Sequence, residues 1–243
     1  MFVVAWRGLG TGGRRPRWGD VGPPVPIMPP PRSKVVVLSK RPKVSSGRLQ
    51  FIPPQIPIPV EHPPEDEGWV HEIKFDGYRT QIIIDKGGVR LYSKNGHDWT
   101  TKYWPIALAA ELPCRAAILD GEVIVAGDQG APDCPALEAA IWNEPSRLAF
   151  VAFDILHLDG RNLSSLPLLQ RKQALWKLVE PGLGKIQYSA HFEGSALAIF
   201  RAVDEMGLEG IISKRADSRY RSGSSNTWLK AKYSAPIAVP DQP

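Results

Sequence analysis

Runs of apolar residues, some alternating with polar ones and some continuous, extend from about residue 67 to residue 233. Short runs bounded by turn residues predict strands, and longer amphipathic stretches predict helices. Leu148 to Leu156 is almost continuously apolar, so we expect a central, buried strand there. The pattern as a whole predicts an α+β domain. It places strands at 69–74, 79–85, 88–93, 117–119, 122–125, 148–156, 185–190, 209–214 and 227–233, and helices at 101–112, 135–142, 168–179 and 194–206.

Three local signals refine this pattern. The run Asp85-Lys86-Gly87-Gly88 indicates a hairpin between two of the predicted strands. Thr100 can cap the first predicted helix. Gly121 lies between two apolar runs, so we expect a turn there.

The first 50 residues differ from the rest in composition. They are rich in Gly, Pro and Arg and show no apolar period, which predicts a disordered arm. Residues 51–64 are still rich in Pro but apolar, which suits an extended segment on a domain surface. We therefore expect an arm at 1–50, a folded domain at 51–235 and a tail at 236–243.

Charge is divided unevenly along the chain. The net charge of +5 combines an arm with ten Lys/Arg and one acid, Asp20, with a remainder that has twenty Lys/Arg and twenty-four acids. A separate basic block of this kind is typical of a nucleic-acid contact. A solvated leader without function, an organelle transit peptide or a misassigned start codon would have the same composition.

Composition excludes several protein classes. No stretch reaches the 18 or more apolar residues of a membrane span, and the apolar start of the chain is too short for a signal peptide. We expect an intracellular protein without a membrane partner. Cys114 and Cys134 lack metal-ligand spacing, and the five histidines form no zinc pattern.

The run His71 to Arg79 carries the main candidate chemistry. Lys74 has apolar neighbours, and Asp76, Gly77 and Arg79 follow it at fixed offsets. A lysine attacks phosphorus only when neutral, and its ordinary pKa is about 10.4, so a nucleophilic lysine needs desolvation or nearby positive charge. Asp76 and Gly77 favour a turn that would bring Arg79 back over the same pocket. Taken alone, the run is also typical of an ordinary hairpin.

Further polar signatures lie at the ends of the predicted strands: Lys94-Asn95-Gly96, Asp120-Gly121-Glu122, Phe153-Asp154, Glu209-Gly210 and Trp228-Leu229-Lys230-Ala231-Lys232. Carboxylates can hold Mg²⁺, cations can neutralise phosphates and an aromatic ring can stack on a base. Each piece alone also fits a structural role, as a core ring or a charged strand edge. Their ordered occurrence after Lys74 predicts a nucleotidyl-transfer site.

These motifs, in this order, resemble the ATP-dependent polynucleotide ligases, and most closely the ligase domain of bacterial non-homologous end-joining ligases. The resemblance covers roughly residues 51–233. It implies a cytoplasmic bacterial protein that is associated with the nucleoid. It implies the covalent nucleotidyltransferase fold, in which two antiparallel sheets flanked by helices hold ATP between them. It also implies that Lys74 forms a lysyl-AMP, and that the AMP passes to a DNA 5′-phosphate before a 3′-hydroxyl seals the nick.

The resemblance also implies roles for individual residues. Glu72 is expected beside the adenine, Phe153 is expected to stack on it, and Arg79 and Glu122 are expected to contact the ribose. Lys230 and Lys232 would hold the α-phosphate. The expected ATP-binding set is Glu72, Ile73, Arg79, Lys94, Glu122, Phe153, Lys230 and Lys232. The expected ligands of Mg²⁺ or Mn²⁺ are Glu209 as the main one, with Glu122 and Asp76.

Three departures from the family pattern limit the interpretation. Lys94 and Ser224 stand where the family usually has arginine, and the sequence ends before the OB-fold that usually follows. We expect nicked or broken DNA as a partner, with a separate OB-fold, end-binding or polymerase protein as a further one. The alternatives are an RNA ligase or capping-type nucleotidyltransferase, and a catalytically impaired remnant that binds nucleotide or DNA.

Overall fold

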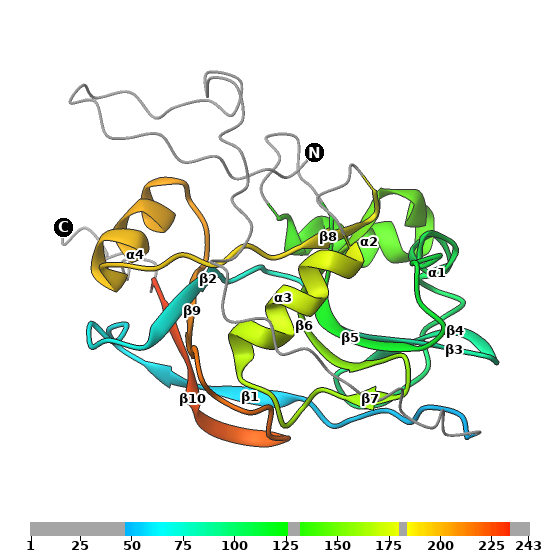
Figure 1. Cartoon of the computed structure of the whole chain (residues 1–243). Coiled ribbons are helices and arrows are strands. Elements are labelled where there is room, and N and C mark those ends of the chain that lie inside the picture. Colours follow the sequence, from blue (N-terminus) through cyan, green and yellow to red (C-terminus); the bar gives the residue numbers. More distant parts are fainter. Residues whose placement is uncertain (1–46, 126–131, 180–183, 234–243) are drawn as a thin grey trace, which may run out of the picture.

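The computed structural model describes residues 47–125, 132–179 and 184–233. Two sheets form the centre of the molecule (Figure 1). The four-stranded sheet has the order β1 (Gln55–Val60), β10 (Gly223–Lys232), β9 (Gly210–Arg215), β2 (Trp69–Ile73). The six-stranded sheet has the order β4 (Gly88–Ser93), β3 (Tyr78–Asp85), β5 (Ala117–Val125), β6 (Leu148–Leu158), β7 (Arg161–Asn162), and β8 (Ile186–Tyr188) pairs with β6.

The predicted α+β class with two sheets is confirmed. The expectation that both sheets are wholly antiparallel is wrong at two pairs. β1 runs parallel to β10, and β8 runs parallel to β6. A long stretch of chain separates the two strands of each pair, as parallel pairing requires.

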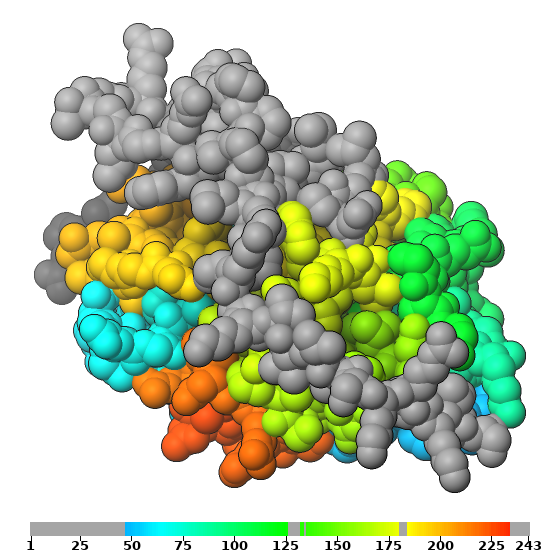
Figure 2. Space-filling model, in the orientation of Figure 1, coloured from blue at the N-terminus to red at the C-terminus, as the bar shows by residue number. Residues whose placement is uncertain are grey.

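Helices pack against both sheets. They are α1 (Trp104–Ala109), α2 (Cys134–Asn143), α3 (Leu168–Val179) and α4 (Ala196–Glu205), with a short 3₁₀ helix, η1, at Pro145–Arg147. Asp133 caps α2 by accepting a hydrogen bond from the Ala136 N–H, and Ser195 caps α4 through the Ala198 N–H. Figure 2 shows α4, in amber, packed against β2 in cyan.

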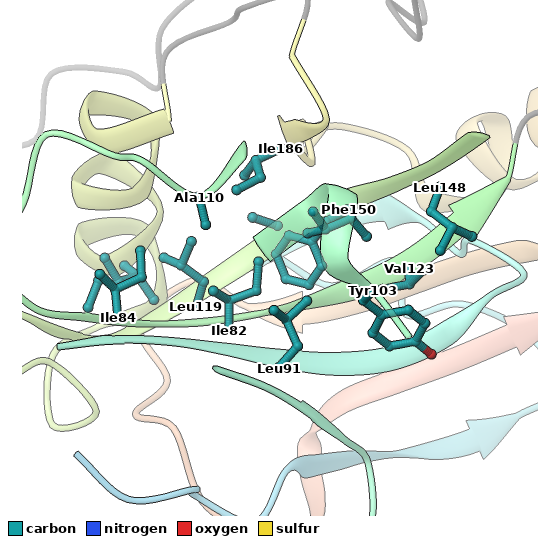
Figure 3. Close-up of a cluster of buried hydrophobic side chains, with 14 of the residues drawn as sticks. Ile82, Ile84, Leu91, Tyr103, Ala110, Leu119, Val123, Leu148, Phe150 and Ile186 are labelled. Carbon is teal, nitrogen blue, oxygen red and sulfur yellow. The ribbon is translucent and has the colours of Figure 1, made fainter. Parts of the chain in front are cut away.

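Three apolar clusters follow from strand alternation, which sends successive side chains to opposite faces. On β3, Ile82 and Ile84 join the largest cluster, between the six-stranded sheet and its helices (Figure 3). Ile83, the residue between them, joins a smaller cluster with Trp228 of β10, so this cluster lies between the two sheets. A third cluster packs α4 on the four-stranded sheet.

β1 was expected only as an extended segment and is a strand. It contains Pro57 and Pro59, and proline is compatible with a strand at a sheet edge because its missing N–H can face away from the ladder. In register, Pro59 pairs with Lys230 and Ile58 with Leu229. The edge of β10 is therefore covered along the part that carries the candidate phosphate-binding lysines.

Gly121 was expected to form a turn and instead continues β5 as one strand. A Cβ atom at this position would lie 2.3 Å from Phe150 Cζ and 2.5 Å from the Val151 carbonyl oxygen. Close packing against β6 thus requires glycine here. The first helix is also shorter than expected, with Trp104–Ala109 in place of 101–112.

The folded domain begins earlier than residue 51. The Leu49 N–H donates to Asp85 Oδ2 at 2.9 Å, and Gln81 bonds both the N–H and the carbonyl of Ile52, at 2.9 and 3.0 Å. Residues 48–50, assigned to the arm, therefore belong to the domain. The predicted arm up to residue 46 and the predicted tail lie outside the described residues.

Within the described ranges, none of the helices has the length and apolar character needed to cross a membrane.

Candidate active site

The two sheets face each other, and their facing sides carry most of the candidate site residues. Strand alternation places these side chains on the same sides as Ile83 and Trp228 of the intersheet cluster. They are Glu72 on β2, Lys74 directly after it, Lys230 and Lys232 on β10, and Arg79, Glu122 and Phe153 on the six-stranded sheet.

Lys74 follows β2 directly and is fixed by its backbone, because its N–H donates to the Gly210 carbonyl at 2.9 Å. Its ammonium forms an ion pair with the Glu209 carboxylate, and Lys232 forms a second ion pair with the same carboxylate. Burial raises the pKa of Glu209, but the hydrogen bonds and charges of Lys232 and Lys74 outweigh it, so the net pKa is lowered. Lys74 and Lys232 therefore share one carboxylate in this structure.

Glu122 lies opposite Arg79 in the β3–β5 register. Burial raises the pKa of Glu122 to about 7; the charges of Arg79 and Lys74 oppose the rise, and those of Asp120 and Glu209 reinforce it. Glu122 therefore interacts electrostatically with both Lys74 and Glu209.

A preformed metal cage is absent from the described residues, since nowhere in those ranges do three His, Cys, Asp or Glu side chains gather. Asp76 is exposed in the β2–β3 connection. Mg²⁺ commonly binds to one or two carboxylates together with substrate phosphates. Glu122 and Glu209 fit that kind of site, in which a nucleotide supplies the remaining oxygen ligands.

Arg79 is held by Asp120, which accepts from Arg79 Nε at 3.1 Å and from Nη2 at 2.7 Å. The guanidinium carbon lies 4.9 Å from the centre of the Phe153 ring and 5.6 Å from that of Trp228. Phe153 is the extra residue of a β-bulge, because Asp120 pairs with Asp154 and Gly121 already pairs with Ala152. Bulges redirect side chains, and this one places an aromatic ring beside a fixed cation.

Glu72 is almost fully buried, at 2% exposure, and is surrounded by donors. Lys172 Nζ lies 2.8 Å and Lys214 Nζ 2.9 Å from its Oε1, while the Ser189 hydroxyl donates to Oε2 at 3.0 Å. Burial raises the pKa of Glu72, but the two lysines lower it more, so the carboxylate is ionised. Burial lowers the pKa of Lys214 to about 8. Its ammonium also lies 4.4 Å from the Phe153 ring centre.

Our sequence interpretation gave no role to Lys172, Arg171, Tyr220 or Lys214. A signal for the first two was present: α3 buries one face through Leu168, Arg171, Lys172, Leu175 and Leu178, so two cations lie on an apolar helical face. Charged residues at such positions need buried partners. Arg171 finds Asp154, with both pairs of atoms 2.8 Å apart.

The side chains of two expected residues do not point toward the other candidate site residues. Ile73 points into the core under α4. Lys94 lies exposed in the turn after β4. Their proposed contacts with ATP remain predictions.

Residues 61–232 match the family model described as the ATP dependent DNA ligase domain. The chain belongs to the ATP-dependent DNA ligases. It is 36% identical over 186 residues to the multifunctional non-homologous end joining protein LigD of Pseudomonas aeruginosa, covering 75% of this chain and 22% of that protein. It is 32% identical to the SPbeta prophage-derived DNA ligase-like protein LigB of Bacillus subtilis, covering 74% of this chain and 67% of that protein.

Solved structures agree with this assignment. A mycobacterial DNA ligase D complexed with ATP and MES is 31% identical, with a TM-score of 0.65, and the match covers 74% of this chain and 60% of that one. The ligase domain of M. tuberculosis LigD gives a TM-score of 0.63 at 29% identity, covering 74% and 58%. The chain spans about a fifth of the Pseudomonas LigD, which is much longer.

Proposed function

We propose that this ligase domain transfers AMP from ATP to Lys74 and then to the 5′-phosphate of nicked DNA, which it seals. The single observation that carries the proposal is the arrangement of Lys74, Glu209 and Lys232 between the two sheets. One nucleophile, one carboxylate and one further cation meet there, as transfer of a phosphoryl group requires.

In the first step, neutral Lys74 Nζ attacks the α-phosphorus of ATP, forming a P–N bond, and its proton passes to water. The bond from the α-phosphorus to the bridging oxygen breaks, and pyrophosphate leaves with that electron pair. Lys230 and Lys232, two residues apart on β10, would neutralise charge on the α-phosphate. Mg²⁺ or Mn²⁺, held by Glu209 and Glu122 with the phosphates, would neutralise the triphosphate.

In the second step, an oxygen of the DNA 5′-phosphate attacks the same phosphorus and the P–N bond breaks. Lys74 regains its proton. In the third step, the 3′-hydroxyl attacks the 5′-phosphate, a phosphodiester forms and AMP leaves. We propose that Arg79 and Glu122 hold the ribose throughout, with Phe153 and Glu72 on the adenine.

Glu209 can influence whether Lys74 is an ammonium ion or a neutral amine. Its carboxylate now neutralises both Lys74 and Lys232. A metal ion held by Glu209 would compete with Lys74 for this carboxylate, so Lys74 would be released from the partner that pairs with its ammonium group. The release favours the neutral amine that attacks.

The relatives named LigD are described as multifunctional, and this chain spans about a fifth of the Pseudomonas LigD. We propose that the domain works in bacterial cytoplasm on chromosomal breaks, together with an OB-fold, end-binding or polymerase component. Such a component would hold the duplex while the two sheets carry out the transfer.

The experiment incubates the purified chain with α-labelled ATP and Mg²⁺ or Mn²⁺, followed by denaturing electrophoresis. Label should stay on the wild type and be absent from Lys74→Ala. Lys177→Ala, an exposed lysine on α3, is the matched control and should be labelled normally. Label on Lys74→Ala, or none on the wild type with either metal, contradicts self-adenylation.

Acceptor choice is measured separately with preadenylated nicks in DNA and in RNA. Sealing of DNA alone supports the proposal, and sealing of RNA alone favours an RNA ligase. If the protein binds ATP but seals neither DNA nor RNA nicks, it is a catalytically impaired domain that only binds nucleotide.

A further inference from the structure

Tyr220 lies in the connection between β9 and β10 and is fixed at several points. Its ring packs edge-on against Trp228, with centres 5.9 Å apart and planes at 87°. Its N–H donates to the Ser164 carbonyl at 2.9 Å. Only 6% of the residue is exposed. The hydroxyl therefore has a defined position inside the intersheet cluster.

That hydroxyl both donates and accepts. It donates to Asp120 Oδ2 at 2.6 Å and accepts from the Gln55 backbone N–H at 3.0 Å. Because the Gln55 N–H occupies a lone pair of the phenol oxygen, the phenol proton is directed toward the carboxylate. Burial and the Asp120 charge raise the pKa of Tyr220, so the hydroxyl keeps this proton.

Asp120 passes the constraint to Arg79. Oδ2 accepts from both Tyr220 and Arg79 Nη2, and Oδ1 accepts from Arg79 Nε. Without the Tyr220 hydroxyl, the Asp120 carboxylate can rotate, and only the two N–H groups of Arg79 remain to orient it. Arg79 is the cation beside the Phe153 ring, on the face of the sheet that looks toward Lys74.

Gln55, whose backbone N–H donates to the Tyr220 hydroxyl, is itself held in place. Gln55 on β1 is fully buried; its amide donates to Thr227 Oγ1 at 3.1 Å and accepts from the Arg221 N–H at 2.7 Å. Gln55 lies outside the residues that match the family model, which begins at residue 61. β1, which lies outside the matched residues, thus contacts the site through the Tyr220 hydroxyl.

We propose that Tyr220 is a positioning residue: its hydroxyl, oriented by the Gln55 N–H, locks the Asp120 carboxylate and so holds the Arg79 guanidinium beside Phe153 for nucleotide binding. The inference rests on the proposed function, because it assigns Arg79 to the nucleotide. The chemistry itself resides in Lys74, and Tyr220 acts only through Asp120 and Arg79.

The test compares Tyr220→Phe with Tyr103→Phe in the full chain. Both remove a hydroxyl from a buried tyrosine, but Tyr103 belongs to the cluster on the helix-covered side of the six-stranded sheet. Hydrogen exchange of the Arg79 Nε–H, followed by NMR, reports the arginine directly and needs no nucleotide. We expect roughly 5-fold or faster exchange in Tyr220→Phe, from the loss of one hydrogen bond to a charged group, and no change in Tyr103→Phe.

ATP affinity is the second readout. Tyr220→Phe should raise the Kd for ATP by roughly 5- to 30-fold. In an Arg79→Lys background the same substitution should add little, because Arg79 is the path through which Tyr220 acts. A loss of affinity that is undiminished in that background would indicate a merely structural role and overturn the proposal. Unchanged Arg79 exchange in Tyr220→Phe would overturn it too.

A wild-type measurement covers the case in which Tyr220→Phe does not fold. The Tyr220 hydroxyl proton should appear as a slowly exchanging resonance, because it is buried and bonded to a carboxylate. A proton that exchanges too fast to observe contradicts the proposal. Altered Arg79 exchange together with a wild type that never forms lysyl-AMP would leave the positioning role standing and reject the proposed function.

Discussion

Lys172 of α3 donates a 2.8 Å hydrogen bond to Glu72 of β2, 100 residues away in the sequence. Both side chains are buried. The same Glu72 oxygen is 2.9 Å from Lys214 Nζ, so two ammonium groups share one carboxylate. A single helix is thereby fastened to the strand that leads directly into Lys74.

Replacing Lys172 with Met should destabilise the domain. Glu72 would keep Lys214 and Ser189 but lose one buried charged donor, which costs about 1–3 kcal/mol of unfolding free energy. Urea denaturation measures the loss. Lys177→Met, an exposed change on the same helix, should stay within about 0.5 kcal/mol of the wild type. Equal stability of the two variants would show that Glu72 does not depend on Lys172.

His191 should titrate far below an ordinary histidine. Burial and the nearby Lys172 lower its pKa to about 4 from an ordinary value of 6.5; Glu72 opposes the shift and Lys214 adds to it. The unfolded chain therefore binds this proton more readily, and stability falls as pH drops from 6.5 to 4. Below pH 4 the histidine adds no further loss.

NMR titration of the His191 ring measures this directly. Its midpoint should move upward in Lys172→Met, because one opposing positive charge is gone. A wild-type midpoint near 6.5 would contradict the burial of this ring.

Gly210→Ala should damage both the fold and the site. Gly210 has φ of +148°, and an added Cβ would lie 2.1 Å from the Ala231 carbonyl oxygen. The resulting shift would separate β9 from β10 beside Glu209 and cost about 2–5 kcal/mol. Lysyl-AMP formation should fall with it, because Glu209 would no longer meet Lys74 and Lys232.

Gly184→Ala is the control for that substitution. The nearest atom to its added Cβ is the Ile186 nitrogen at 4.0 Å, an ordinary contact. It should melt and self-adenylate like the wild type. If Gly210→Ala formed lysyl-AMP normally, the ion pairs of Glu209 would not depend on the spacing between β9 and β10.

Removing residues 1–46 should weaken binding to duplex DNA. This segment has nine Lys/Arg and one acid, so its loss removes a net charge of +8. Each lost phosphate contact should flatten the slope of log K against log salt by about 0.9. Fluorescence anisotropy at several salt concentrations measures both effects, while label transfer to Lys74 serves as the control for folding. An identical slope in the two chains would assign no DNA contact to the segment.

Much of the fold was predictable because strand alternation is local. The hairpin at Asp85–Gly88 and the long buried strand of β6 were both found from runs of a few residues. Gly121 was misread because its reason lies in another strand: only the position of Phe150 shows that a Cβ would clash. Pro57 and Pro59 likewise hid a strand whose edge position depends on β10.

The site was predictable as a set of residues but not as a set of partners. The order of motifs brought Lys74, Glu209 and Lys232 into one hypothesis, and the structure joins them. That Glu72 pairs with Lys172, or Asp120 with Tyr220, depends on contacts between residues about 100 positions apart. The helical pattern indicates that Lys172 needs a buried partner, but it does not indicate which residue that partner is.

β1 and β10, the first and last strands described, lie side by side, and β10 carries Lys230 and Lys232. A ribosome that has produced only the segment through Glu209 has already made the proposed nucleophile, Lys74, and its carboxylate partner, but not the strand that completes the sheet. The four-stranded sheet therefore cannot be complete until β10 has been made. A chain interrupted after Glu209 would present Lys74 without the lysines of β10.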